Sequence, residues 1–166
     1  EFTDIGDPIP WVHLGFLQVW RLAKDSLYHA LGQIPAFKKV IVTVHSLGSA
    51  VASLCALELA AKDGYGGLKC TTFASPRTYF GRPTRFDSTI TESLRVFNPA
   101  DIVTQSPTIP FVHVKGGLAI KAKVKDYHSL LDTYQPGLRA LLTSLMGERV
   151  EIEPNEAEAI EKTHSS

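Results

Sequence analysis

The chain has 166 residues, of which 44% are hydrophobic and 20% are charged. These values are typical of a globular domain with a buried core, and they exclude a disordered chain. Seventeen basic residues balance seventeen acidic ones, so no broad positive field is available for nucleic acid and a neutral partner is favoured. The longest apolar stretch, Leu47 to Ala61, contains Glu58 and is too short to span a bilayer.

The first half of the chain alternates helical and strand patterns. Apolar residues at three- and four-residue steps between 16 and 31 predict an amphipathic helix that Gly32 and Pro35 end. Residues 40–44 form a β-branched run without alternation, which predicts a strand covered on both faces, as in a parallel sheet. Residues 50–61 are apolar almost all round and predict a buried helix, and residues 70–74 predict the next strand.

Two cysteines, Cys55 and Cys70, lie within these apolar runs. A free cysteine in such a run usually behaves as a small core residue, so we expect two buried thiols. A single disulfide between them is the alternative.

The second half predicts shorter elements. Residues 94–97 form a third strand, and residues 111–115 and 118–124 predict two more, joined across Gly116 and Gly117 as a hairpin. A final helix is expected to start near Pro136. Together these elements predict an α/β layered domain over residues 1–147, followed at 148–166 by an acidic, solvated tail with one helical turn near Glu156.

A serine lies between the strand at 40–44 and the buried helix, in the sequence His45-Ser46-Leu47-Gly48. A serine on such a turn is lifted above the sheet edge, and the backbone N–H groups that follow it point toward a developing oxyanion. Gly48 is expected because a side chain there would crowd the neighbouring strand. Val44 replaces the first glycine of the G-x-S-x-G pattern, which predicts a strained turn or a wider spacing to the next strand. The alternative is that Ser46 only caps the helix.

A nucleophilic serine needs a base, for which two histidines follow it in the folded region. His113 lies inside an apolar run and is expected to be structural, whereas His128 lies in a loop before the last helix and is the predicted base. His45 is adjacent to the nucleophile and is expected to pack or hydrogen-bond beneath the elbow. His29, on a helix, and His164, in the tail, fit no site.

The base needs an orienting carboxylate. In proteins that present a nucleophilic serine on a strand-to-helix turn, this carboxylate lies between the serine and the histidine along the chain. Asp101 follows a strand and the Asn98-Pro99 turn, as expected at the carboxyl end of a parallel strand. Asp126 and Asp132 are too close to His128 in sequence, and Asp87 lies in a polar loop. Asp101 is therefore the predicted acid.

Six segments in order resemble the class 3 (fungal-type) lipase family, from about Trp11 to Tyr134. The segments at 11–16, 42–49 and 72–77 resemble the V-H-x-G-F, G-H-S-L-G-G and T-F-G-S-P-R patterns of the family. Those at 96–103, 111–114 and 126–134 resemble V-N-x-x-D-x-V, Y-x-H-V and the final H-x-x-Y. This sequence departs from the family patterns at two positions of the elbow, Val44 and Ser49. In addition, the family has a strand with an R-G-(S/T) stretch before the first of these segments, and no residues before Trp11 match it.

The resemblance implies a three-layer α/β-hydrolase fold with a mostly parallel sheet, lacking the N-terminal strands and lid in the chain as given. It implies a triad of Ser46, His128 and Asp101, with the Leu47 N–H as one oxyanion donor, and no metal or organic cofactor. The second donor and the lid are expected upstream of Glu1. Removing one oxyanion donor typically costs a hundred- to a thousandfold in rate.

The function predicted from these features is a serine carboxylic-ester hydrolase, a lipase that acts on acylglycerols through an acyl-enzyme, in lipid degradation. A lipid–water interface is the expected place of action, with no nucleic acid partner and no membrane-spanning segment. The alternatives are a feruloyl-type esterase on the same scaffold and a lipase-like protein that binds lipids or partners without turnover. Family members are often secreted, which favours that compartment. The sequence does not define the oligomeric state.

Overall fold

A parallel β-sheet forms the centre of the protein. The computed structural model describes residues 2–3, 11–33, 39–61, 67–121 and 126–146. The sheet has the order β3-β4-β6-β8, and each neighbouring pair is parallel. Its strands are β3 (Ile41–His45), β4 (Lys69–Phe73), β6 (Glu92–Phe97) and β8 (Gly117–Ala119).

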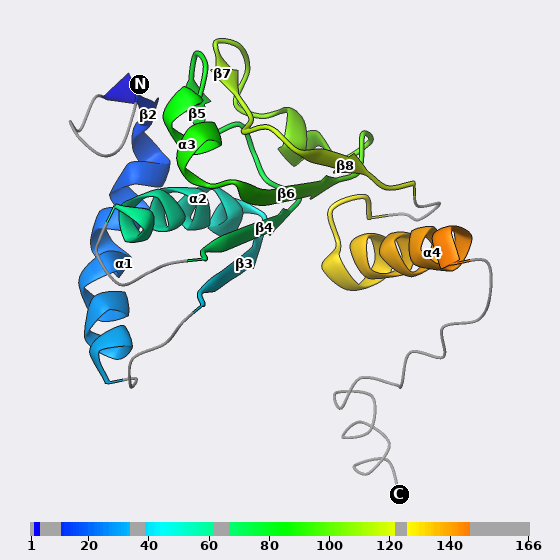
Figure 1. The fold of residues 1–166 in the computed structure, drawn as a ribbon. Helices are drawn as coiled ribbons and strands as arrows, with labels where there is room; N and C mark the ends of the chain where they lie inside the picture. Colours follow the sequence, from blue (N-terminus) through cyan, green and yellow to red (C-terminus); the bar gives the residue numbers. More distant parts are fainter. Residues whose placement is uncertain (1, 4–10, 34–38, 62–66, 122–125, 147–166) are drawn as a thin grey trace, which may run out of the picture.

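Helices cover both faces of this sheet, so that the fold has three layers, as Figure 1 shows. One layer consists of α1 (Leu14–Gly32), α2 (Leu47–Ala60) and α3 (Thr84–Thr89). The other contains α4 (Gln135–Met146), whose Leu138 and Leu141 pack against the cluster of Ala74, Val96 and Ile120. The predicted layered α/β fold is therefore confirmed.

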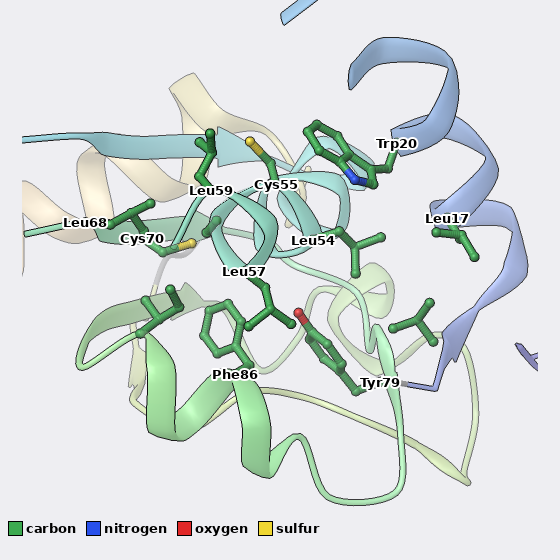
Figure 2. Packing of buried hydrophobic residues seen from close by; sticks show 13 residues of the cluster. Leu17, Trp20, Leu54, Cys55, Leu57, Leu59, Leu68, Cys70, Tyr79 and Phe86 are labelled. Carbon is green, nitrogen blue, oxygen red and sulfur yellow. The ribbon is translucent and has the colours of Figure 1, made fainter. Parts of the chain in front are cut away.

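The larger core cluster lies on the α2 side of the sheet. Figure 2 shows Trp20 of α1, Leu54 and Leu57 of α2, and Tyr79 and Phe86 in one packed group. Most of α2 is buried, as its apolar composition predicts, because α1, α3 and the sheet surround it. A helix that is apolar all round needs such surroundings.

The two cysteines are free and buried in this cluster. Burial raises the pKa of both the Cys55 and the Cys70 thiol to about 12. The expectation of two structural thiols is confirmed, and the disulfide alternative is wrong.

A second, small antiparallel sheet has the order β1-β2-β5-β7. Its strands are β1 (Phe2–Thr3), β2 (Val12–His13), β5 (Tyr79–Phe80) and β7 (Phe111–Val112). The predicted hairpin across Gly116 and Gly117 is wrong, because β7 pairs with β5 here while β8 pairs with β6 of the large sheet. Gly116 has a φ of +82°, and a Cβ there would lie 2.8 Å from the Ser93 carbonyl oxygen, so this glycine carries the chain from one sheet to the other.

Strand β3 lies at one edge of the parallel sheet, and in the described part of the chain its outer side pairs with no strand. Ile41 is 62% exposed, and Thr43 is exposed as well. The prediction that this strand is covered on both faces is therefore wrong. An apolar run does not indicate whether a strand lies at the centre or at the edge of a sheet, and at the edge the strand has fewer neighbours to cover it. Beside this edge lies an apolar groove of about 490 Å³, which we call the edge groove; its walls include Ala23, Leu27 and Val51.

Smaller differences concern the short elements. Asp87, predicted to lie in a polar loop, is part of α3. The last helix, α4, begins at Gln135, which confirms the predicted start near Pro136; the π-helix Leu130–Tyr134, which was not predicted, leads directly into it. The acidic tail at 148–166, with its turn near Glu156 and His164, lies outside the described residues, as does the end of the predicted strand at 118–124.

Candidate active site

Ser46 lies on a tight turn between the last residue of β3 and the first of α2. Its backbone has φ 59° and ψ −135°, a region that residues other than glycine rarely adopt and that stores strain. The Ser46 N–H donates to the Phe73 carbonyl at the end of β4 (3.0 Å), and the Ser49 N–H donates to the Ser46 carbonyl (2.8 Å). The sheet and the helix thus hold the turn from both sides.

The hydroxyl of Ser49 stabilises the turn from below. Its Oγ lies 2.7 Å from the Val44 carbonyl oxygen and 2.9 Å from that of Phe73, and the side chain is fully buried. It thus links the ends of β3 and β4 with the first turn of α2. The serine that departs from the family's glycine at this position has a structural role that the sequence pattern does not indicate.

Val44, the other departure, leaves no room for a side chain at Gly48. A Cβ on Gly48 would lie 2.5 Å from Val44 Cγ1, well inside the contact distance of two carbon atoms. The expected crowding therefore comes from Val44 itself, not from the neighbouring strand. The register Val44↔Thr72 and His45↔Phe73 continues to the end of β3, so the valine does not widen the spacing to β4.

The structure brings the three predicted side chains into one hydrogen-bonded chain. His128 Nε2 lies 2.7 Å from Ser46 Oγ, and His128 Nδ1 lies 2.8 Å from Asp101 Oδ2. Since the carboxylate only accepts, Nδ1 carries a proton and donates it to Asp101, which leaves Nε2 to accept from the Ser46 hydroxyl. This tautomer is the one that a general base requires.

Asp101 follows β6 and is almost fully buried, at 1% exposure. Its Oδ1 accepts the Val103 N–H (3.0 Å), because Asp101 caps the short 3₁₀-helix Ile102–Gln105. Its Oδ2 accepts from both His128 Nδ1 and the Tyr134 hydroxyl (2.8 Å each). Three hydrogen bonds thus satisfy the oxygens of this buried side chain.

Tyr134 is a site residue that sequence reasoning missed. Its side chain is fully buried, and its hydroxyl accepts the Asn98 N–H (3.1 Å) while it donates to Asp101. Burial, together with the adjacent Asp101 carboxylate, raises the pKa of this phenol, so it remains a donor. No spacing rule indicates this contact, because it depends on the π-helix that turns Tyr134 toward Asp101.

The rejected candidates lie away from this chain of hydrogen bonds. His113 Nε2 donates to the Thr104 carbonyl (2.7 Å), and burial, with the nearby Arg95 charge, lowers the pKa of His113 to about 4. Asp126 accepts the His128 backbone N–H, and Asp132 accepts the Ser129 hydroxyl, so neither meets the His128 ring. These two aspartates shape the backbone of the loop.

His45 lies beneath the elbow, as expected, and makes a contact that the sequence did not predict. Its Nε2 lies 2.9 Å from the carbonyl oxygen of His128, and its ring packs on the His128 ring with centroids 4.7 Å apart. The edge of the Tyr134 ring approaches it as well, at 5.9 Å.

Leu47 is the first residue of α2, so its N–H has no acceptor within the helix. It lies at the positive end of the helix dipole and directly follows Ser46 in the chain. Among the described residues there is no group of three metal-ligating side chains, and no helix in these ranges is long and apolar enough to cross a membrane.

The parallel sheet and the strained strand–serine–helix turn define an α/β-hydrolase fold, and Ser46, His128 and Asp101 form one hydrogen-bonded chain at that turn. Residues 2–111 match the class 3 lipase family, and the chain belongs to that family. The matched range includes Ser46 and Asp101 and ends before His128, whose placement comes from the hydrogen bonds above.

Similar proteins are fungal lipases. A secreted mono- and diacylglycerol lipase of Penicillium cyclopium is 32% identical over 106 residues, covering 61% of this chain and 34% of that protein. The crystal structure of a mono- and diacylglycerol lipase from Aspergillus oryzae superposes with a TM-score of 0.65 at 25% identity, over 80% of this chain and 51% of that one. Lipase II of Rhizopus niveus gives 0.61 at 28%, over 80% and 61%. The chain thus spans about a third of the curated relative and between half and two thirds of the solved ones.

Proposed function

We propose that this protein hydrolyses carboxylic esters of the acylglycerol type, with Ser46 as nucleophile, His128 as base and Asp101 as the group that orients His128. The observation that carries the proposal is the hydrogen-bonded chain from Ser46 Oγ through the His128 ring to Asp101 Oδ2, at 2.7 and 2.8 Å. It lies on the turn where this fold presents a nucleophile.

Acylation begins when Ser46 Oγ attacks the ester carbonyl carbon and its proton passes to His128 Nε2. The carbonyl oxygen becomes an oxyanion, which the Leu47 N–H stabilises at the start of α2. The tetrahedral intermediate collapses as the bond to the leaving alcohol breaks, and His128 gives its proton to that alcohol oxygen. The product is an ester of Ser46 with the acyl group.

Deacylation repeats these steps with water. His128 takes a proton from water, the hydroxide oxygen bonds to the acyl carbon, and the proton returns to Ser46 Oγ as the free acid leaves. In both halves the imidazolium of His128 faces the buried Asp101 carboxylate, whose negative charge stabilises it. Val103 and Tyr134 also donate to Asp101, so both of its oxygens have partners in the protein interior.

The substrate class comes from the relatives. The proteins from Penicillium and Aspergillus are named as mono- and diacylglycerol lipases, and this chain belongs to the same family. A neutral acyl ester also suits a chain without net charge. Acylglycerols with one or two acyl chains are therefore the proposed substrates.

The direct test is covalent labelling of the 166-residue chain with a fluorophosphonate probe, followed by peptide mass mapping. We expect one label, on Ser46, because the probe reports a serine whose base is in place. S46A should remain unlabelled, and S88A, which removes an exposed hydroxyl of α3, should label like the wild type. An unlabelled wild-type chain, or a label on another serine, would refute the assignment of the nucleophile.

Turnover separates the substrate classes. Hydrolysis of monoolein, 4-nitrophenyl butyrate and methyl ferulate should be compared under equal conditions. We expect monoolein and the butyrate to be hydrolysed and the ferulate to be poor. Preference for the ferulate would favour a feruloyl-type esterase, and labelling without turnover of any ester would favour a lipid-binding protein.

A further inference from the structure

His45 occupies a place that the mechanism above does not use. It is the last residue of β3, directly before Ser46, and its half-buried ring lies under the ring of His128. We propose that His45 is a positioning residue, which holds the backbone of the loop that carries His128 and so sets the distance between the base and Ser46. This inference rests on the proposed function of Ser46 and His128.

The base needs such support because of where it lies. His128 is part of a turn that precedes the π-helix Leu130–Tyr134, and it belongs to no strand of either sheet. The His128 N–H donates to the Asp126 side chain and the Ser129 hydroxyl caps the π-helix, but both contacts remain within the loop. They shape the loop without fixing it relative to Ser46.

His45 supplies the connection to the sheet. Its Nε2 lies 2.9 Å from the His128 carbonyl oxygen, and this oxygen only accepts, so Nε2 carries the proton and donates it. The donor belongs to the residue next to the nucleophile, and the acceptor belongs to the base itself. One hydrogen bond therefore connects the side chain of the residue before the nucleophile with the backbone of the base.

The ring of His45 adds a second constraint. It packs on the His128 ring at 4.7 Å with an interplanar angle of 40°, and the Tyr134 ring meets it at 5.9 Å and 75°. Tyr134 in turn donates to Asp101. The His45 ring is thus in contact both with the ring of the base and with the residue that donates to Asp101.

Donor and ring can be separated by substitution. His45→Phe keeps an aromatic ring under His128 and removes the donor, whereas His45→Gln keeps an N–H donor of similar reach and removes the ring. His29→Phe is the matched control, because His29 is an exposed histidine of α1 outside the site. The wild type and the three variants should be compared in the rate of fluorophosphonate labelling and in kcat and KM for 4-nitrophenyl butyrate.

We expect H45F to lower the labelling rate and kcat about tenfold with KM changed less than twofold, since a hydrogen bond of about 1.4 kcal/mol corresponds to a factor of ten. H45Q should recover most of this loss, and H29F should equal the wild type. A purely structural role would instead lower the melting temperature of H45F and H45Q alike and leave kcat per folded molecule unchanged. That pattern would overturn the inference.

A second measurement is independent of turnover. The proton on His128 Nδ1, held by Asp101, gives a low-field ¹H NMR signal in the resting protein, identified by its loss in D101N. We expect this signal to broaden or disappear in H45F and to persist in H45Q and H29F. A signal unchanged in H45F would refute the positioning role, even if the wild type were unlabelled and the proposed function therefore wrong.

Discussion

The elbow predicts a specific incompatibility between two positions, Val44 and Gly48. In Gly48→Ala the new methyl group would lie 2.5 Å from Val44 Cγ1, against about 3.5–4.0 Å for a normal carbon contact. Val44 cannot simply rotate away, because a β-branched side chain has few accessible rotamers and its backbone pairs with Thr72 of β4. The strain must be distributed over β3, the elbow and the start of α2.

The size of the effect follows from this overlap. Overpacking of this kind costs about 1–3 kcal/mol, and the higher helix propensity of alanine returns up to about 1 kcal/mol. We expect G48A to lower the free energy of unfolding by about 1–2 kcal/mol in the natural background. In a V44A background the clash is gone, so the same substitution should be neutral or slightly stabilising.

Urea unfolding followed by tryptophan fluorescence measures all four corners of this double-mutant cycle. The expected coupling energy between positions 44 and 48 is about 2 kcal/mol. Substitutions at distant sites deviate from additivity by only about 0.3–0.5 kcal/mol, so a coupling of this size is measurable. Gly32→Ala is the control, because a Cβ at Gly32 meets no atom within 4 Å. An equal loss from G48A in both backgrounds would refute the assignment of the clash to Val44.

Three further predictions concern buried groups. Y134F removes the hydroxyl that donates to the buried Asp101 carboxylate, so we expect kcat to fall about tenfold and the free energy of unfolding to fall by about 1–3 kcal/mol. The His113 pKa of about 4 lies below its unfolded value of 6.5, so the unfolded state binds the extra proton first, and stability should fall as pH decreases from 6.5 to 4; H113Q should show a flatter urea midpoint over this range. Cys55 and Cys70 should react with a thiol reagent only slowly in the folded protein, because burial keeps both thiols protonated and inaccessible. Both thiols should react rapidly in about 8 M urea, which unfolds a domain of this size.

Each of these has a clear contrary result. Unchanged kcat in Y134F would mean that Asp101 needs no donor other than Val103 and His128. Parallel pH profiles for the wild type and H113Q would assign the acid sensitivity to another group. Rapid labelling of either thiol at neutral pH would show that the α2 core opens readily.

The local parts of the site could be read from the sequence, since they depend on residues close in the chain. The β-branched run, Ser46, Gly48 and the apolar helix follow one another directly, and each constrains its neighbour. The choice of Asp101 followed from its place after a strand, and that of His128 from its loop. The structure brings His128 to Ser46 and Asp101 to His128.

Parts that depend on distant pairing could not be read in this way. The strands at 111–115 and 118–124 look like a hairpin because a pair of glycines separates them, yet their partners, β5 and β6, lie far away in the sequence. The contact of Tyr134 with Asp101 requires the π-helix, which no periodicity signals. The exposure of Ile41 reflects the lateral position of β3, which is a property of the whole sheet.

The outer edge of β3 has a consequence for the protein in concentrated solution. In the described part of the chain this strand presents its backbone N–H and C=O groups to the solvent beside the apolar edge groove. Such an edge is a template on which strands of other molecules add, and charge or proline usually guards against it. Ile41 and Thr43 provide neither. The apparent mass of the 166-residue chain in light scattering should therefore rise with concentration, and Ile41→Lys should suppress that rise without touching the Ser46 site.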